Sequence, residues 1–434
     1  MVISNSPSIY FMRNYKRVFF LLLVSLLTAC NSSNVTTNDT TTTFSSSVEE
    51  IKTGVSNKSS ISGSLLNEQD DPLVKWEGRN EFKIGDRETP ARMYLYHTAT
   101  GFSIDFYGTS LEVDFYHSGL NDIYYEYAID DEVIPTNNRR FYLPKGQEKY
   151  TALLAEDLSE GHHIIKCLKA SEPRDGITAI EELRTDGHFY YRRGIDQEKL
   201  KFMCVNASSG SGYGVLAYSE GSSKISRTTK NSSSLHSYMY MTARRFDADV
   251  HYIASAGWGI AFPSKYSIPA VFDYTGITAS NNVEGAKTTA LWDHQSYVPD
   301  VILMHLGGND TDEKDFDLVT YQETIVNFVD KLHKLYPLAK IIWMHTNTNS
   351  GGYGMTALEE FGAVRKGYVK EVIFPKVGKG ETGDNTFGAS SHHSFKSHLD
   401  ASKIITEFIN ETYGYEVKRD ALTFEQFESI IEKK

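Results

Sequence analysis

The chain has few basic residues, and its most apolar run is short. It carries 44 Lys and Arg residues against 56 Asp and Glu residues, a formal net charge of −12 over 434 residues. Binding to a nucleic-acid backbone needs clustered Lys and Arg, so the composition argues against a nucleic-acid partner and favours neutral or weakly charged ones. The apolar run from Val18 to Leu27 is too short to serve comfortably as a permanent membrane-spanning helix.

Cysteine is also scarce, with three in the whole chain. The first, Cys30, follows a basic stretch (Arg13–Arg17), the apolar run and the small residues Thr28-Ala29. This arrangement resembles a bacterial lipoprotein box, so residues 1–30 are predicted to be a lipoprotein signal peptide with Cys30 as the lipidated first residue of the mature protein. We therefore expect a lipid anchor in the bacterial cell envelope, at the outer membrane or cell surface or facing the periplasm. The alternative is an ordinary signal peptide with an incidental cysteine.

The other two cysteines, Cys167 and Cys204, lie in apolar, strand-like runs, where a free cysteine usually behaves as a small core residue. A disulfide between them stays open, because sequence alone does not decide pairing. The histidine pairs His162-His163 and His392-His393 do not have the spacing of zinc ligands. We expect no metal and no cofactor.

The composition changes along the chain and predicts its domains. Residues 31–73 are rich in Ser, Thr and Asn and predict a disordered tether, because such a segment buries too little apolar surface to offset its ordering entropy. Residues 74–195 show short runs of period-two alternation separated by turn residues, which predict an antiparallel β-sandwich. The clearest runs are Phe102–Phe106, Leu111–Phe115, Tyr124–Ile129 and Ile164–Leu168. Leu158–Gly161 is predicted to be a hairpin turn.

Residues 196–415 alternate strand and helix patterns, which predicts a doubly wound, three-layer α/β domain with a parallel sheet. The predicted strands are Phe202–Val205, Val250–Ala254, Val301–Leu306 and Ile341–His345. The predicted helices cover Leu235–Phe246, Tyr321–Leu335 and Ala401–Tyr413. Residues 416–434 are predicted to be a short charged tail.

Four clusters of small and polar residues follow this pattern. Three come directly after predicted strands, and the fourth supplies histidines near the carboxyl end: Asn206–Gly212, Ser255–Gly259, Gly307–Asp310 and Gly388–His393. Open α/β sheets carry their reactive groups at the carboxyl ends of their strands. Ester hydrolysis needs a serine hydroxyl, a base and donors for the oxyanion, and these clusters can supply all of them. Each also has a plainer interpretation as a connecting loop, a turn glycine or a capping asparagine.

The order of these motifs resembles the SGNH (GDSL-type) hydrolase superfamily and, more narrowly, carbohydrate esterase family 2. Asn206–Gly214 is similar to that family's Gly-Asp-Ser region followed by Gly-Tyr-Gly, and Gly388–His398 resembles its Gly-Ala-Asp-Trp-His-Pro-Ser block. Phe106–Leu111 matches a stretch of its first domain. The resemblance covers roughly residues 74 to 410. It implies a jelly-roll sandwich over 74–195, a flavodoxin-like SGNH domain over 196–415, and removal of acetyl groups from plant polysaccharides.

The resemblance also implies roles for single residues. Ser208 would be the nucleophile and His392 the base. The backbone N–H groups of Ser208 and Gly257 would form the oxyanion hole together with the side-chain amide of Asn309. Gly259 is an alternative to Gly257, and two further histidines compete with His392, namely His393 and His398.

Two departures from the family pattern leave the activity open. Asn206-Ala207 stands where the family has Gly-Asp, and Ala389 takes the place of the acidic residue three positions before the histidine. A Ser-His dyad is then implied, with the Ser391 carbonyl orienting the ring and Asp384 as a less favoured substitute.

The favoured hypothesis is a carbohydrate O-acetylesterase that works through an acyl-enzyme, as a monomer, on an acetylated polysaccharide or oligosaccharide. The alternative is a catalytically weak or inactive glycan-binding lipoprotein that keeps the esterase scaffold. A hydrolase acting on lipids or on bacterial surface glycans ranks lower, because no long apolar lid is evident.

Overall fold

The computed structural model describes residues 55–70, 72–192, 199–262, 264–278, 280–346, 348–375 and 386–434. The chain divides into two units, Met1–Glu50 and Ile51–Lys434, and every described residue belongs to the second. The predicted signal peptide, Cys30, most of the predicted tether and Asp384 lie outside the described residues. For the end of the tether the prediction of disorder is wrong, because Ser60–Ser62 forms a strand of the sandwich and Ile61 and Leu66 are buried in its core. Within them, no helix combines the length and apolar character needed to cross a membrane.

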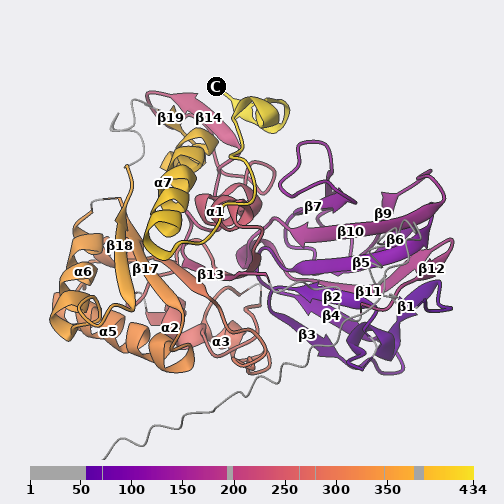
Figure 1. The fold of residues 1–434 in the computed structure, drawn as a ribbon, viewed down its shortest axis with the longest axis horizontal. Coiled ribbons are helices and arrows are strands. Elements are labelled where there is room, and N and C mark those ends of the chain that lie inside the picture. Colours follow the sequence, from indigo (N-terminus) through magenta and orange to yellow (C-terminus); the bar gives the residue numbers. More distant parts are fainter. Residues whose placement is uncertain are drawn as a thin grey trace, which may run out of the picture. The chain divides into compact units, whose positions relative to one another are not determined.

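The amino-terminal half forms two antiparallel sheets (Figure 1). The first has the order β3-β4-β11-β6-β9, with β1 paired to β11. Its strands are β1 (Ser60–Ser62), β3 (Asn80–Lys83), β4 (Arg92–Leu95), β6 (Leu111–His117), β9 (Lys149–Ala155) and β11 (Thr178–Thr185). The second has the order β12-β5-β10-β7-β8, with β2 paired to β5. Its strands are β2 (Val74–Glu77), β5 (Gly101–Gly108), β7 (Ile123–Ile129), β8 (Arg140–Leu143), β10 (Gly161–Lys169) and β12 (His188–Phe189).

Period-two alternation explains why these strands form a sandwich. In β6, Leu111, Val113 and Phe115 are buried while the residues between them are only partly buried, so one face of the strand enters the core. The predicted hairpin at Leu158–Gly161 is wrong. Strand β9 pairs with β6, whereas β10 pairs with β5 and β7, so this connection crosses from one sheet to the other.

The carboxyl-terminal half contains a five-stranded parallel sheet of order β15-β13-β16-β17-β18. Its strands are β13 (Lys201–Asn206), β15 (Asp249–Ala254), β16 (Val301–His305), β17 (Lys340–His345) and β18 (Val369–Ile373). This is the 2-1-3-4-5 order of flavodoxin-like folds. The α-helices are α1 (Tyr238–Arg245), α2 (Ile268–Val271), α3 (Val283–Ala286), α4 (Gly308–Thr311), α5 (Leu318–Leu335), α6 (Asn349–Phe361) and α7 (Phe395–Tyr413).

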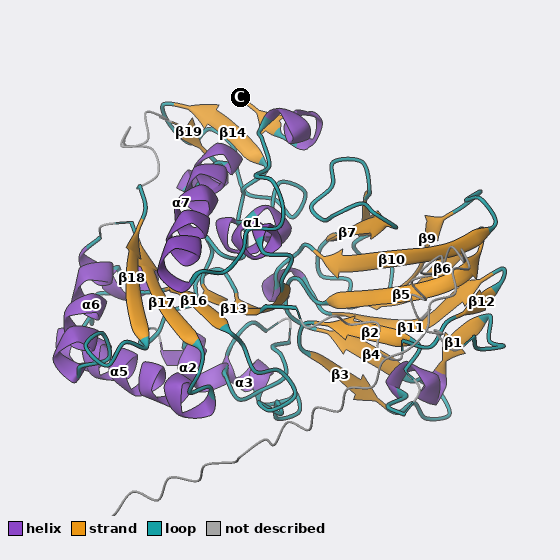
Figure 2. Cartoon of the chain, viewed as in Figure 1, coloured by secondary structure: helices purple, strands orange, loops and turns teal. Residues whose placement is uncertain are grey.

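Helices cover both faces of this sheet because its strands are apolar on both sides. Phe202 and Cys204 of β13 pack with residues of α1 and α7 in one buried cluster. Met203 and Val205 of the same strand pack with residues of α5 and α6 in another. The three layers can be followed in Figure 2.

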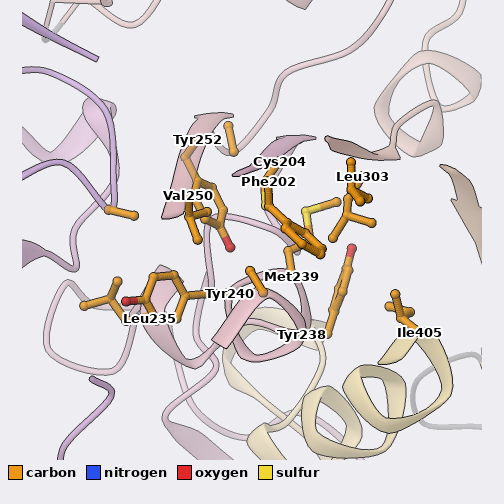
Figure 3. Close-up of a cluster of buried hydrophobic side chains, with 14 of the residues drawn as sticks. Phe202, Cys204, Leu235, Tyr238, Met239, Tyr240, Val250, Tyr252, Leu303 and Ile405 are labelled. Atoms are coloured by element: carbon orange, nitrogen blue, oxygen red, sulfur yellow. The ribbon is translucent and has the colours of Figure 1, made fainter. Parts of the chain in front are cut away.

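The first of these clusters also includes sandwich residues. Tyr124, Ala128 and Leu168 belong to the same buried cluster as Phe202 and Leu235. Figure 3 shows the α/β side of the cluster, where Tyr238, Met239 and Ile405 lie against the strands. Residues of the sandwich and of the α/β layer therefore pack together in this cluster, while the sandwich also has a buried cluster of its own.

Three further points complete the fold. Cys167 and Cys204 are free, buried thiols in separate clusters. The segment predicted to be a charged tail contains the 3-10 helix η6 (Glu425–Ile430) and strand β20 (Glu432–Lys433), which pairs with β14 (Ala217–Glu220). Its Phe427 is only 3% exposed and lies in a small buried cluster with residues of α7.

Candidate active site

Three of the four polar clusters emerge from one edge of the parallel sheet. Asn206, the last residue of β13, is in register with Ala254 of β15 on one side and His305 of β16 on the other. The turns that follow these residues carry Ser208, the glycines of 255–259 and Asn309. The register of the sheet thus brings together three segments that span about a hundred residues of chain.

The fourth cluster brings an imidazole to the serine. His392 Nε2 lies 2.8 Å from Ser208 Oγ, a hydrogen-bonding distance. Ser208 is half-buried in the turn after β13, and His392 directly follows the 3-10 helix η5 (Ala389–Ser391). The structure therefore brings together the two residues that the sequence singled out as nucleophile and base.

The other nitrogen of this ring is fixed by a backbone carbonyl. His392 Nδ1 lies 2.9 Å from the Ser390 carbonyl oxygen. Because a carbonyl only accepts hydrogen bonds, Nδ1 carries the proton and Nε2 is left to accept from Ser208. The expectation that the Ser391 carbonyl would do this is wrong. Ser390 and Ser391 both have positive φ angles, 50° and 63°, and this left-handed turn directs the Ser390 carbonyl back to the ring at a cost of roughly 1 to 2 kcal/mol per residue.

The environment of His392 favours the neutral ring. Burial lowers the pKa of His392 below its ordinary value of 6.5, the Arg227 charge lowers it further, and the hydrogen bond from Nδ1 to Ser390 partly opposes this. The Tyr213 ring packs 4.5 Å from the imidazole, centroid to centroid, and the Arg227 guanidinium lies 4.9 Å from the Tyr213 ring centroid. A neutral imidazole is the form that can act as a base.

The glycine loop after β15 offers a free backbone donor at Gly257. Among the described residues, the N–H groups of Ser208 and Gly257 donate to no other group, whereas Gly259 N donates to Tyr266 O at 3.1 Å. Gly257 has a φ of +81° and an exposed backbone. Of the two glycines, Gly257 is therefore the one whose N–H is available to a ligand.

Asn309 is oriented by the same loop. Its Nδ2 donates to the Trp258 carbonyl at 2.7 Å, and its second N–H has no acceptor within the described residues. The next residue, Asp310, is fully buried and accepts hydrogen bonds from three consecutive backbone N–H groups at 260–262, over distances of 2.7 to 3.1 Å. Asn309 and Asp310 thus tie the start of α4 to the glycine loop.

Asn206 fills the position where the resemblance expects glycine. Its side chain is buried, with Oδ1 accepting from the Ala207 N–H at 2.5 Å and Nδ2 donating to the Tyr238 hydroxyl at 2.6 Å. That hydroxyl lies 2.5 Å from His305 Nδ1. The substitution therefore builds a hydrogen-bonded support behind the nucleophile turn, and the Ser208–His392 contact is present alongside it.

The competing histidines lie elsewhere. His398 Nδ1 accepts from the Tyr238 N–H at 3.0 Å, and the His393 ring lies 5.5 Å from that of His398. Within the described part of the chain, His392 is the histidine that hydrogen-bonds to Ser208. No group of three or more His, Cys, Asp or Glu side chains among the described residues could hold a metal ion.

A cavity of about 370 Å³ opens beside Gly257. Its lining comes from both halves of the chain and consists of Arg174, Ala256, Gly257, Tyr266, Ser280 and Asn281. Arg174 and nearby Glu172 were not predicted from the sequence, because they lie in the sandwich, outside every hydrolase motif. Asn281, whose Oδ1 accepts from Ser255 Oγ at 2.7 Å, was not predicted either.

Comparisons with known proteins agree with this architecture. The family model described as "Carbohydrate esterase 2 N-terminal" matches residues 78–191. The acetylxylan esterase / glucomannan deacetylase of Cellvibrio japonicus is 22% identical over 261 residues, which cover 59% of this chain and 69% of that protein. The cellulase/esterase CelE of Acetivibrio thermocellus is 24% identical over 286 residues, which cover 63% of this chain and 31% of that protein.

Solved structures share the fold. A family two carbohydrate esterase from Clostridium thermocellum in complex with cellohexaose has a TM-score of 0.65 at 22% identity, covering 79% of this chain and 100% of that chain. A family two carbohydrate esterase from Cellvibrio japonicus has a TM-score of 0.66 at 18% identity, covering 82% and 98%. The predicted fold, a jelly-roll sandwich followed by an SGNH domain, is confirmed. The chain is a relative of carbohydrate esterase family 2.

Proposed function

We propose that this protein is a carbohydrate O-acetylesterase that hydrolyses acetyl esters on a polysaccharide or oligosaccharide. The observation that carries the proposal is the 2.8 Å contact between Ser208 Oγ and His392 Nε2, in which the Ser390 carbonyl holds the ring in the tautomer needed for a base. The kinship to carbohydrate esterases, among them an acetylxylan esterase and cellohexaose-bound enzymes, supports a carbohydrate ester as substrate.

The reaction needs no group beyond this chain and water. His392 Nε2 takes the proton of Ser208 as Oγ attacks the acetyl carbonyl. The N–H groups of Ser208 and Gly257 and the free N–H of Asn309 receive the oxyanion. The tetrahedral intermediate collapses, the sugar oxygen leaves with the proton from His392, and an acetyl-serine remains. Water, deprotonated by His392, then attacks this ester, which releases acetate and returns the proton to Ser208.

A dyad is sufficient for this chemistry because the third member of a triad mainly orients the ring and stabilises its charge. Here the Ser390 carbonyl orients the ring and presents the negative end of its dipole to Nδ1. The strained turn at Ser390 and Ser391 is the structural cost of this arrangement.

The alternative of a glycan-binding protein with little turnover rests on the replacement of Gly-Asp by Asn206-Ala207. One solved relative is described as an esterase whose active site displays divergent catalytic and non-catalytic binding functions. The intact Ser208–His392 contact supports the enzyme over this alternative.

The test is acetate release from a panel of acetylated polysaccharides by the wild-type protein and two variants. We expect Ser208→Ala and His392→Ala each to lower kcat by at least about 10³-fold, since loss of a nucleophile or its base leaves only binding and oxyanion stabilisation. His393→Ala is the matched control, because within the described residues it is the His392 ring, and not that of His393, that hydrogen-bonds to Ser208. A wild type no more active than Ser208→Ala favours the glycan-binding alternative, and full activity in both variants rules out the assigned dyad.

We further propose that the protein is anchored in the cell envelope through lipid on Cys30, on the strength of the signal-like segment before that residue. Mass spectrometry of the amino-terminal peptide tests this. A lipidated Cys30 is expected, and an unmodified cysteine would leave an ordinary exported protein.

A further inference from the structure

We infer that Glu172, a residue of the sandwich, is a positioning residue that holds the oxyanion loop of the α/β domain in its working geometry. This inference rests on the proposed function, because it assigns Glu172 to the machinery of that reaction. Glu172 lies between β10 and β11, just before the 3-10 helix η2 (Pro173–Asp175). Its side chain is only 1% exposed.

The carboxylate of Glu172 binds both loops that flank the proposed oxyanion. Its Oε2 accepts from the Ala256 backbone N–H at 2.6 Å and lies 3.1 Å from the Ser211 hydroxyl. The Ser211 hydroxyl also lies 3.0 Å from the Ser208 carbonyl oxygen. One carboxylate oxygen therefore links the nucleophile turn to the glycine loop.

The contact at Ala256 bears directly on the proposed donor at Gly257. The Ala256 N–H belongs to the peptide plane of Ser255 and Ala256, and the Gly257 N–H belongs to the next plane along the chain. Only the φ and ψ angles of Ala256 separate the two planes, so fixing the first plane narrows the directions in which the Gly257 N–H can point. Gly257 has no side chain to hold it, and a Cβ built there would meet no atom within 4 Å. Glu172 supplies the restraint that the glycine itself lacks.

The support for Glu172 is itself rigid. Lys169 Nζ, which is buried, donates to the carbonyl oxygens of Gly176 at 2.9 Å, Tyr96 at 3.0 Å and Leu95 at 3.2 Å. These bonds hold the loop that carries Glu172 next to the carboxyl end of β4. The glycine loop is thus fixed from the sandwich side as well as by Asp310 on its own side.

Asp175 provides a control for this inference, because it binds the same arginine as Glu172. Arg227 donates to Glu172 Oε1 at 3.1 Å and to both oxygens of Asp175 at 2.5 and 2.6 Å. Asp175 therefore shares the loop, the burial and the arginine partner of Glu172, yet among the described residues it makes no hydrogen bond to Ala256 or Ser211. A role in docking the two domains through Arg227 would make both carboxylates matter equally, whereas a role in positioning the glycine loop would single out Glu172.

The experiment compares Glu172→Ala with Asp175→Ala in the full chain, by acetate release and by amide hydrogen exchange of the peptide covering 255–262. For Glu172→Ala we expect kcat to fall by roughly 10- to 100-fold, as for a displaced oxyanion donor. KM should stay within about twofold, and exchange in the glycine-loop peptide should become at least about tenfold faster. Asp175→Ala should leave kcat within about threefold and exchange of this peptide unchanged.

A third variant guards against misfolding. Glu172→Gln keeps an oxygen acceptor for the Ala256 N–H, so its kcat should lie between those of the wild type and Glu172→Ala. Equal effects of the Glu172 and Asp175 variants, or wild-type exchange in Glu172→Ala, would overturn the inference. If the wild type releases no acetate, the proposed function fails, and the exchange comparison alone decides whether Glu172 holds the loop.

Discussion

The imidazole of His392 works in an environment that disfavours its charged form. Burial is the main cause, and Arg227 adds a positive charge behind Tyr213, while the Ser390 carbonyl acts in the opposite direction. The enzyme proposed here therefore depends on a histidine that remains a neutral base into mildly acidic solution.

This leads to a prediction for the pH dependence of turnover. A base is lost as the pH falls through its pKa, and the pKa of His392 lies below 6.5. We expect the acidic limb of kcat/KM to have its midpoint below pH 6.5, so that more than half of the maximal kcat/KM remains at that pH. A profile of kcat/KM from pH 4 to 8 measures this, and a midpoint above 6.5 would contradict the environment described for the ring.

Asn206 is a substitution whose meaning differs between the sequence and the structure. Beside a reactive serine, the loss of Gly-Asp suggests weakened catalysis. In the structure, the Asn206 side chain bonds to the Ala207 N–H and the Tyr238 hydroxyl. The sequence could not reveal this, because Tyr238 lies 32 residues further along the chain.

At the scale of elements, the loop from Ser255 to Phe262 is held by hydrogen bonds to three side chains from outside it. Asp310 holds its end through three N–H groups, Asn281 holds Ser255 and the Trp258 indole, and Glu172 holds Ala256. The donors that receive an oxyanion gain most when they are fixed before the reaction begins. The loop meets that requirement without regular secondary structure.

The two glycines of this loop should respond differently to substitution. A Cβ at Gly259 would lie 2.1 Å from the Phe262 carbonyl oxygen, whereas one at Gly257 would meet nothing within 4 Å. We expect Gly259→Ala to displace the loop and lower both kcat and the unfolding free energy. Gly257→Ala should cost only roughly 1 to 2 kcal/mol of stability, from a non-glycine residue at φ +81°. Thermal unfolding and acetate release on the two variants compare these effects, and equal losses would show that steric contact at Gly259 is not decisive.

At the scale of the whole molecule, charged side chains join the sandwich to the α/β layer, in addition to the buried cluster that contains residues of both. Arg79 of the sandwich is fully buried and donates to the carbonyls of Phe272 and Tyr274, at 2.6 and 2.9 Å. Lys75 of β2 pairs with Asp249 of β15 at 3.0 Å. The two halves are therefore expected to unfold together.

A buried carboxylate near this junction predicts how stability depends on pH. Burial alone would raise the pKa of Glu77, but Lys166 at 3.1 Å, Lys75 and the Ser103 hydroxyl together bring it well below its ordinary value of 4.5. A depressed folded-state pKa stabilises the protein above pH 4.5, and this contribution is lost as the pH falls through the folded-state pKa. Glu77→Gln should lower the unfolding free energy at pH 7 by roughly 1 to 3 kcal/mol.

The same variant should also lose less stability than the wild type between pH 5 and pH 3. Urea unfolding at these pH values makes the comparison. If the unfolding free energy of both proteins decreased equally between pH 5 and pH 3, other carboxylates would be the main cause of the loss of stability in acid.

The sequence by itself determined the classes of the two halves and the order of the strands that frame the site. Alternation in runs such as Leu111–Phe115 and fully apolar runs such as Phe202–Val205 fix which faces are buried, and burial dominates the choice of element. Strand β18 and helix α6 were not predicted. β18 carries Lys370 and Glu371 at the sheet's edge, and α6 begins with glycine-rich sequence.

Tertiary structure alone decided how the site is completed. The sequence indicated Ser208, His392 and Asn309 because they lie within recognisable motifs. It could not show that the Ser390 carbonyl, rather than that of Ser391, orients the ring, because this depends on two consecutive left-handed residues. Nor could it show that Glu172 reaches across from the sandwich to Ala256, 84 residues away. Local pattern records which side chains must be buried, whereas contacts between distant loops arise only once the chain has packed.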